Sequence, residues 1–364
     1  MKCATSQSKS FQTGRQIATY RAGKRTDDNA IPLSIEELEA KARDRLSPEA
    51  YDWVAGVAGG GGTARANLAA FERWQIVPRM LRDISQRDFS VDILGRRWPM
   101  PFAIAPIGVQ ACCHPEGELA TARAAASLGI TFILSTVSTY PMEEVAAVGG
   151  PRWYQLYWSK LPEITQSFLS RAEKAGYEAI VVTLDTQSLG WRESNLQLAH
   201  LPFLHGIGLA NYFSDPVFRS LLEQPPEHDV SAAADKYLEV FSNLAHTWES
   251  LQFIRDNTRL PILVKGVQHP DDARQALDSG VNGIVVSNHG GRQTDGSAGT
   301  LDVLPGVVAA VGGRVPVLFD SGIRRGCDVF KAIALGANAT LLGRPYMWAL
   351  TVGGEAGVRE YLMN

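Results

Sequence analysis

Cysteine is scarce in this chain of 364 residues, and its spacing excludes the usual structural uses. The four cysteines are Cys3, Cys112, Cys113 and Cys327. Their intervals match no zinc-ligand pattern, and adjacent cysteines such as Cys112 and Cys113 rarely bridge each other. Proteins without disulfides are typical of reducing compartments. The sequence therefore predicts a cytoplasmic protein with no metal site and no disulfide framework.

Long apolar runs and an excess of positive charge are also missing. No run reaches the roughly 18–20 apolar residues that a membrane-spanning helix needs. The chain has 35 Lys and Arg against 38 Asp and Glu, a net charge of -3. It therefore lacks the global basic field that nucleic-acid binding requires. We expect neither a membrane nor a nucleic acid as a partner.

The first 26 residues contain no Asp or Glu. Six basic residues stand there among Ser and Thr. This composition is typical of a mitochondrial transit peptide, which is the alternative to a cytoplasmic location. No clear apolar helical face accompanies the charges, so residues 1–30 are interpreted as a polar arm that packs on a neighbouring surface. Residues 31–364 are interpreted as a single domain.

The chain does contain a regular alternation of short apolar runs and helical patterns. The runs are Phe102–Ala105, Phe132–Leu134, Trp153–Leu156, Ala179–Leu184, Ile262–Val264, Gly283–Val286, Val315–Phe319 and Thr340–Leu342. Nearly all of their residues are apolar, as in parallel strands buried on both faces. Eight βα units predict an α/β protein with a closed (β/α)8 barrel, the TIM barrel. The runner-up is a doubly wound open sheet, but the glycines Gly59–Gly62 follow a helical pattern and not a strand.

Two additions to the barrel are predicted. Helical patterns at Glu36–Leu46 and Pro48–Val57 precede the first strand, and we expect them to cap the bottom of the barrel. The segment from about 190 to 247, after the fourth strand, is too long for an ordinary connection and is interpreted as a lid. Within it, Glu223–Asp229 is expected to lie in solvent.

Helical patterns also separate the strands. They are Pro115–Leu128, Glu163–Ala175, Trp248–Asp256, Asp271–Asp278 and Asp328–Leu335. In the first, Glu116 and Glu118 fall in the opening turn, where the helix dipole favours anions. His114 and Glu118 have the spacing of two metal ligands on one helix face, but a capped helix start is the preferred interpretation.

Polar residues or glycines end almost every predicted strand. They are Pro106-Ile107-Gly108, Ser135, Gln155 with Tyr157, Thr183 with Asp185, Lys265, Ser287-Asn288-His289, Asp320 with Gly322 and Arg324, and Gly343-Arg344. Barrel enzymes carry their active sites at these C-terminal strand ends. Lys, His and Arg are not turn-forming residues, so a turn alone does not explain them. We therefore expect an active site at this face.

The last two units predict a phosphate site. Asp320–Gly326 and Gly343–Pro345 each follow a strand and open a helix. Glycines let main-chain N–H groups approach an anion, helix N-termini add positive potential, and arginine binds phosphate oxygens in pairs. Barrels often hold phosphates after strands seven and eight. This feature alone indicates a phosphorylated ligand.

The loop after the sixth strand predicts acid–base chemistry. His289 stands three residues before Arg292 on a glycine-rich loop. A histidine can act as a base at neutral pH, and the arginine can hold a carboxylate. Asp185 is expected to orient the imidazole and to stabilise its charge.

These segments resemble the FMN-dependent 2-hydroxy-acid oxidases and dehydrogenases. The stretch from Ser287 to Gln293 (SNHGGRQ) matches the signature of that family, and the resemblance runs from about Ser34 to the C-terminus. It is also carried by Ala105–Gly108, His114–Glu118, Gln155–Tyr157 and Asp320–Arg324. Within the family the chain is most similar to lactate 2-monooxygenase, on the motifs Arg73–Arg79, Leu189–Arg192, Gly208–Tyr212 and Asp215–Phe218.

The resemblance implies FMN as the cofactor and a small, lactate-like L-2-hydroxy acid as the substrate. It implies that His289 takes a proton from the substrate and that Asp185 supports its charge. The residues implied to bind the substrate carboxylate are Arg192 and Arg292, and those implied to hydrogen-bond the substrate are Tyr51 and Tyr157.

The resemblance also implies a set of flavin contacts. Lys265 is expected near the N1–O2 edge of the ring, where its charge stabilises the reduced form. The ring or the ribityl chain is implied to contact Pro106, Ile107, Gly108, Ser135, Gln155, Thr183 and Ser287. The ribityl chain and phosphate are implied to contact Asp320, Ser321, Gly322, Ile323, Arg324, Gly343 and Arg344.

Several alternatives stay open at this point. The electrons can pass to O2 or to another acceptor, and the product can be a released 2-keto acid or, as in lactate 2-monooxygenase, a decarboxylated acid. The family also implies a homotetramer. Other phosphate-binding barrels, such as IMP dehydrogenase or type 2 isopentenyl diphosphate isomerase, do not explain His289 with Arg292. An inactive flavin-binding barrel is the last alternative, because relatives continue beyond Asn364.

One motif departs from the family pattern. Relatives often carry Arg-Pro in the lid motif, whereas Glu193-Ser194-Asn195 follows Arg192 here. This difference bears on the identity of the substrate.

Overall fold

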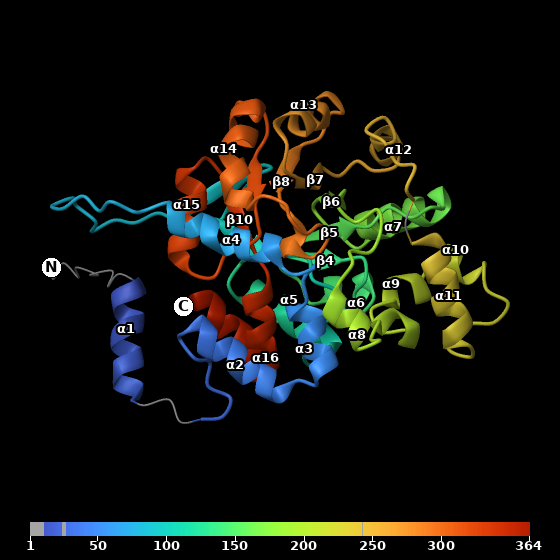
Figure 1. The fold of residues 1–364 in the computed structure, drawn as a ribbon, viewed down its shortest axis with the longest axis horizontal. Helices are drawn as coiled ribbons and strands as arrows, with labels where there is room; N and C mark the ends of the chain where they lie inside the picture. Colours follow the sequence, from blue (N-terminus) through green and yellow to red (C-terminus); the bar gives the residue numbers. More distant parts are fainter. Residues whose placement is uncertain (1–10, 24–26, 242) are drawn as a thin grey trace, which may run out of the picture.

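A closed barrel of eight parallel strands forms the centre of the structure (Figure 1). The structure, a computed structural model, describes residues 11–23, 27–241 and 243–364. The strands are β3 (Phe102–Ile104), β4 (Phe132–Ser135), β5 (Arg152–Leu156), β6 (Ile180–Thr183), β7 (Ile262–Val267), β8 (Gly283–Val286), β9 (Val317–Phe319) and β10 (Ala339–Leu342). They follow one another around the barrel in chain order, and β10 closes against β3. The predicted (β/α)8 barrel and its eight strands are confirmed.

Helices surround the barrel. They are α5 (Gly117–Ser127), α6 (Met142–Ala147), α7 (Pro162–Lys174), α12 (Leu251–Asp256), α13 (Pro270–Asp278), α14 (Thr300–Val311), α15 (Gly326–Ala334) and α16 (Arg344–Met363). The five helices predicted between the strands are confirmed. Helix α14 was not predicted, and Pro305 lies inside it, where proline normally breaks a helix.

The interior of the barrel is a separate apolar cluster from the layer between strands and helices. Side chains from alternate strand positions, such as Ile133, Val181 and Val285, fill it. A hairpin of β1 (Val91–Ile93) and β2 (Arg96–Trp98) contributes Ile93 and Trp98 to the same cluster. The hairpin therefore fills one end of the barrel interior.

The two helices predicted before the barrel form but lie elsewhere, and a third helix there was not predicted. They are α2 (Ile35–Arg45), α3 (Pro48–Ala55) and α4 (Gly62–Arg73). The expectation that the first two cap the bottom was wrong. Arg292 and Arg344, at the C-terminal face of the barrel, both donate hydrogen bonds to the carbonyls of Val54 and Gly56 at the end of α3. Carbonyls at a helix C-terminus attract cations, which draws α3 to the active-site face.

The predicted lid is a folded subregion. It contains α8 (Glu193–Gln197), the 3-10 helix η2 (Pro202–His205), α9 (Ala210–Phe213), α10 (Pro216–Arg219) and α11 (Val230–Val240). Buried aromatic side chains, including Phe203, Tyr212 and Phe218, hold it together. Asp215 is fully buried, caps α10 and pairs with Arg171 of α7 at 3.1 Å. The segment Glu223–Asp229 is largely exposed, as expected.

Helix α5 begins two residues later than predicted, and one of its acids is not at the surface. Glu118 is fully buried, and its Oε1 accepts hydrogen bonds from the main-chain N–H groups of Gln110 and Thr139, both at 3.1 Å. Glu118 does lie in the opening turn, as predicted, but its burial and its contact with two loops were not predicted. His114 caps its own turn by accepting from the N–H of Glu116 at 3.2 Å.

The predicted N-terminal arm contains the helix α1 (Phe11–Ala22). Arg15 of this helix pairs with Glu360 of α16 at 2.7 Å. The basic residues Lys2, Lys9, Lys24 and Arg25 lie outside the described residues. Among the described residues, no helix is both long and apolar enough to cross a membrane.

The hairpin offers a test of the fold that leaves the active site alone. Trp98 is 2% exposed and its ring lies 5.2 Å from that of Trp153. Trp98→Ala should lower the free energy of unfolding by about 3–5 kcal/mol, because it leaves a cavity at the end of the barrel interior. Thermal denaturation of the flavin-loaded protein checks this. The control Trp191→Ala removes a side chain that is 70% exposed and should change the midpoint little. Equal midpoints for the two variants would contradict the role given to the hairpin.

Candidate active site

A single pocket collects most of the predicted site residues at the C-terminal ends of the strands. The predicted residues that line it are Pro106, Ile107, Gly108, Tyr157, Arg192, Lys265, His289, Arg292, Asp320, Ser321, Gly322, Ile323, Arg324, Gly343 and Arg344. They come from six different strand ends and from the lid. Gly108 is required by close packing, because a Cβ there would lie 2.2 Å from the carbonyl oxygen of Val137.

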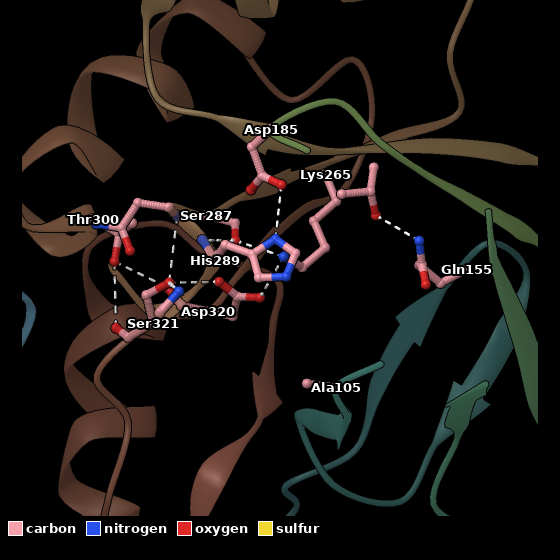
Figure 2. Close-up of polar contacts among 12 residues, drawn as sticks. Ala105, Gln155, Asp185, Lys265, Ser287, His289, Thr300, Asp320 and Ser321 are labelled. Carbon is pink, nitrogen blue, oxygen red and sulfur yellow. Dashed lines mark hydrogen bonds and ion pairs between the residues drawn. The ribbon is translucent and has the colours of Figure 1, made fainter. Parts of the chain in front are cut away.

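His289 and Asp185 form a hydrogen-bonded pair, as predicted. His289 Nδ1 lies 2.8 Å from Asp185 Oδ1, and Figure 2 shows the carboxylate directly above the imidazole. The main chain of His289 has a φ of +57°, a left-handed conformation that is unfavourable for a residue with a Cβ. Such strain, of order 1–3 kcal/mol, is found mainly at functional sites. The backbone strain helps to direct the imidazole into the pocket.

The two side chains of this pair titrate in a way that suits a base. Burial raises the pKa of Asp185, but the neighbouring His289 and Lys265 outweigh burial and lower the pKa to about 2. Burial also lowers the pKa of His289 below its ordinary value, although Asp185 opposes this shift. His289 is therefore neutral at neutral pH. With Nδ1–H donated to Asp185, Nε2 carries the free lone pair.

Tyr157 lies on the same side of the pocket. Its hydroxyl is 3.5 Å from His289 Nε2. Burial raises the pKa of Tyr157, so the phenol stays protonated and can donate a hydrogen bond. A group that binds between Tyr157 and His289 meets one donor and one acceptor.

Arg192 and Arg292 also line the pocket, and they are in contact with each other. Arg192 belongs to the lid and donates to the carbonyl of Arg292 at 3.1 Å and to Gln293 Oε1 at 2.9 Å. Burial lowers the pKa of both arginines, and for Arg292 the charges of Arg192 and Arg344 add to the effect. Neither side chain forms a salt bridge with an acid in the described part of the chain. Two half-buried guanidinium groups that pair with no acid in these ranges favour an anionic ligand.

Arg324 and Arg344 are a second pair of half-buried arginines, and Arg344 shares its main-chain acceptors with Arg292. Arg344 donates to the carbonyls of Val54, Gly56 and Gly290 at 2.9–3.1 Å, and Arg324 donates to that of Ile323 at 3.0 Å. Burial lowers the pKa of Arg344 to about 10 and also lowers that of Arg324. No acid within the described ranges forms a salt bridge with either. The loops after β9 and β10 therefore bring together the arginines and glycines on which the predicted phosphate site depends.

Lys265 supplies a further cation to the pocket, and this one is buried. Its Nζ donates to Ser287 Oγ at 2.8 Å and lies 3.4 Å from Asp320 Oδ2, as Figure 2 shows. Burial lowers the pKa of Lys265, but Asp320 and Asp185 raise it above its ordinary value, so the side chain is charged.

Four predicted flavin contacts lie one layer behind the pocket surface. Gln155 Nε2 donates to Thr183 Oγ1 at 2.9 Å, and Ser135 Oγ donates to Gln155 Oε1 at 3.0 Å. Ser287, the fourth, accepts the bond from Lys265. All four are buried and none is among the side chains that line the pocket. They are close enough to orient the lining but do not form it.

The structure does not bring Tyr51 to the pocket. Its hydroxyl donates to Glu39 Oε1 at 2.8 Å and accepts from Arg43 at 2.7 Å, while its ring stacks on Trp348. Trp53 lines the pocket instead, two residues along α3. Residues on a helix that are two apart point in different directions, so only one of them can face the site.

One side of the pocket lining, an apolar wall, was not predicted from the sequence. Its members are Trp53, Val137, Leu189, Phe203 and Phe241. The signal that could have found Leu189 and Phe203 was the lid itself, because a lid that covers a site contributes to its lining. The departure at Glu193-Ser194-Asn195 forms the start of α8 and does not line the pocket. Asn195 instead bonds to Asp52 of α3.

The residues present fit FMN. Arg324 and Arg344, with the glycine-rich loops after β9 and β10, suit a phosphate, and the same pocket has an apolar lining that suits a ring system. Its four arginines form no salt bridge with an acid in the described ranges, which suits a pocket that takes anionic groups.

Comparison with known proteins agrees with this geometry. The model of the family of FMN-dependent dehydrogenases matches residues 42–364. An FMN-dependent alpha-hydroxy acid dehydrogenase from Penicillium citrinum is 44% identical over 338 residues, which cover 92% of this chain and 84% of the relative. An L-lactate oxidase from Lysinibacillus sphaericus is 43% identical over 340 residues, with 92% and 86% covered. The crystal structure of a mandelate oxidase superimposes with a TM-score of 0.81 at 44% identity, with 91% and 90% covered. The chain belongs to the family of FMN-dependent dehydrogenases.

Proposed function

We propose that this protein oxidises a small, lactate-like L-2-hydroxy acid to the 2-keto acid, with His289 as the base. The observation that carries the proposal is His289 held by Asp185 at 2.8 Å, in a pocket lined also by Arg192 and Arg292, which form no salt bridge with an acid in the described part of the chain. FMN, when bound, accepts the hydride from the substrate carbon and passes the electrons on to O2.

The protein side chains bind, orient and deprotonate the substrate. Arg192 and Arg292 hold the carboxylate, which fixes the α-carbon relative to the imidazole. His289 Nε2 takes the hydroxyl proton, and the charge that develops on the ring is stabilised by Asp185. Tyr157 donates a hydrogen bond to the substrate oxygen. Lys265 supplies the positive charge that favours a reduced, anionic ring.

The apolar wall selects the substrate side chain. Trp53 and Phe203 meet edge to face with ring centroids 5.5 Å apart, and Phe241 packs against Tyr157 at 5.3 Å. The phenylalanine rings have no hydrogen-bonding atom to offer a polar substituent. An acid with a methyl or another apolar side chain fits this surface better than a hydroxylated or charged one.

The fate of the keto acid depends on the lid. Leu189, Arg192 and Phe203 of the lid all line the pocket, and Arg192 fastens the lid to the loop of His289 through the carbonyl of Arg292. A lid held in this way favours a second outcome, in which the keto acid stays in the site while O2 is reduced. Hydrogen peroxide formed there would convert the keto acid to a shorter acid, CO2 and water, as in lactate 2-monooxygenase.

We also propose that the protein is a homo-oligomer, a tetramer like its family. The support is the segment 74–90, between α4 and β1, which projects from the body beyond α4 and α15 (Figure 1). Its apolar side chains are exposed: Val77 by 84%, Met80 by 73%, Leu81 by 104%, Ile84 by 61% and Phe89 by 54%. A second copy would cover this apolar surface. The free thiols of the described cysteines support a reducing compartment, the cytoplasm.

Replacement of the base tests the proposed chemistry. His289→Gln should keep FMN bound and lower the rate of anaerobic flavin reduction by about 10²–10⁴-fold. In the wild type this rate should fall as the pH drops through the pKa of His289, which lies below 6.5. In the variant the rate should not show this fall. Stopped-flow bleaching across pH 4.5–8 measures both. The control His228→Gln changes an exposed histidine and should behave as wild type. A variant reduced at the wild-type rate would contradict the role of His289.

Arginine geometry can be tested separately from arginine charge. Arg292→Lys keeps the charge but loses the planar fork that binds a carboxylate in pairs. A lost charged hydrogen bond is worth about 1.5–3 kcal/mol, so we expect kcat/KM for the acid to fall roughly 10- to 150-fold. Arg219→Lys, which retains an exposed pair with Glu227, is the matched control. Unchanged steady-state constants in Arg292→Lys would show that Arg292 does not bind the substrate.

The products distinguish the two outcomes of the lid. Aerobic turnover of L-lactate, or of the best acid in a panel, should be followed by quantifying keto acid, shorter acid, CO2 and hydrogen peroxide. If the lid retains the keto acid, CO2 and the shorter acid form in equal amounts with little peroxide. Gly190→Ala would place a Cβ 2.3 Å from the carbonyl of Arg292, which loosens the lid and should raise the peroxide yield. Stoichiometric keto acid and peroxide from the wild type would exclude the monooxygenase outcome and leave the oxidase.

A further inference from the structure

A fully buried polar network lies directly behind the loop that leaves β3. This loop, Ala105–Gly108, lines the pocket on the side away from Asp185 (Figure 2). Two of its carbonyls are held from behind. Tyr346 Oη donates to the oxygen of Ala105 at 3.1 Å, and Gln110 Nε2 donates to that of Ile107 at 2.9 Å. The position of this loop therefore depends on two side chains outside the pocket.

The two side chains are also bound to each other and to the rest of the fold. Gln110 Nε2 lies 3.2 Å from Tyr346 Oη, and Gln110 Oε1 accepts from Thr121 Oγ1 at 2.6 Å. Every one of these three side chains has 0% exposure. Tyr346 stands two residues after Arg344 on α16, so the helix that carries a pocket arginine also supports the β3 loop. In a water-free interior such a network has few alternative partners and specifies one geometry.

Glu118 joins the β3 loop to the next one. Its Oε1 accepts from the N–H groups of Gln110, after β3, and of Thr139, after β4, both at 3.1 Å. Between these points Val109 N–H donates to the carbonyl of Val137 at 2.9 Å. Burial raises the pKa of Glu118 to about 7, against the hydrogen bonds that lower it. The protein therefore keeps an unfavourably buried acid at the junction of two loops that line the pocket.

We propose that Gln110, Glu118 and Tyr346 are positioning residues, which fix the Ala105–Gly108 backbone against the flavin ring and so set the rate of hydride acceptance. This inference rests on the proposed function and on the flavin contacts that the family resemblance implies for Pro106, Ile107 and Gly108. The network takes no part in the chemical step. It controls the position of the backbone at which the step occurs. A displacement of about 1 Å at a reacting centre can cost roughly 10²-fold in rate.

The test compares four variants of the flavin-loaded protein. Tyr346→Phe removes the hydroxyl that bonds both Ala105 and Gln110, and Thr121→Val removes the donor that orients the Gln110 amide. Glu118→Gln keeps the acceptor for both N–H groups and is the conservative variant. Tyr212→Phe is the matched control, because the Tyr212 hydroxyl is buried and has no hydrogen-bond partner among the residues that the structure describes.

Three quantities separate positioning from plain stability: the flavin absorption spectrum, the limiting rate of anaerobic reduction and the dissociation constant of the substrate. Tyr346→Phe should shift the absorption bands and lower the limiting rate by about 10- to 100-fold. The dissociation constant should stay within about twofold, because Arg192 and Arg292 are untouched. Glu118→Gln and Tyr212→Phe should resemble wild type in all three.

The inference is overturned if Tyr346→Phe only melts at a lower temperature and keeps the wild-type spectrum and limiting rate. If Tyr346→Phe does not retain FMN, Thr121→Val decides, and wild-type values in that variant overturn the inference. The spectrum, and the midpoint potential measured with dithionite, require no substrate. Failure of every 2-hydroxy acid to reduce the wild type would therefore count against the proposed function alone.

Discussion

Half-buried positive charge without a salt-bridged acid is the constraint on which the site depends. Arg192, Arg292, Arg324 and Arg344 all line the pocket at the C-terminal end of the barrel, and none forms a salt bridge with an acid in the described ranges of the chain. Removing a charge from water is costly unless it is paired. Their N–H groups are partly satisfied by main-chain carbonyls, which do not neutralise the charge. The proposed function supplies two anions for this charge, the FMN phosphate and the substrate carboxylate.

The same arginines connect parts of the chain that are distant in sequence. Arg292 and Arg344 both bond to the C-terminal carbonyls of α3, and Arg192 ties the lid to the loop that carries His289. These bonds therefore fix the relative positions of four elements: α3, the lid, the loop that carries His289, and α16. The arginines that charge the pocket are therefore also the residues that fix the arrangement of these elements.

Much of the barrel and of the site could be predicted from the sequence, because the signals are local. Strands buried on both faces give continuous apolar runs, and a lysine, histidine or arginine at a strand end has no role in a turn. His289, Asp185 and Lys265 were found in this way. The family resemblance supplied the assignment to FMN.

The errors have a common physical origin in contacts between distant segments. The direction in which Tyr51 points is set by Arg43, Glu39 and Trp348, and the placement of α3 is set by arginines more than two hundred residues away. The burial of Glu118 depends on two loops that meet only in the folded barrel. Local spacing carries no information about such partners, so a pattern typical of a helix start concealed a buried acid.

The most direct measurement compares the best L-2-hydroxy acid of a panel with its own amide, which has the same shape but no charge. Anaerobic flavin reduction by both compounds is followed by stopped flow. If Arg192 and Arg292 bind the substrate carboxylate, the acid should bleach the flavin. The amide should react about 10²–10⁴-fold more slowly, since one or two charged hydrogen bonds are lost. Equal second-order rates for acid and amide would contradict this account of the site.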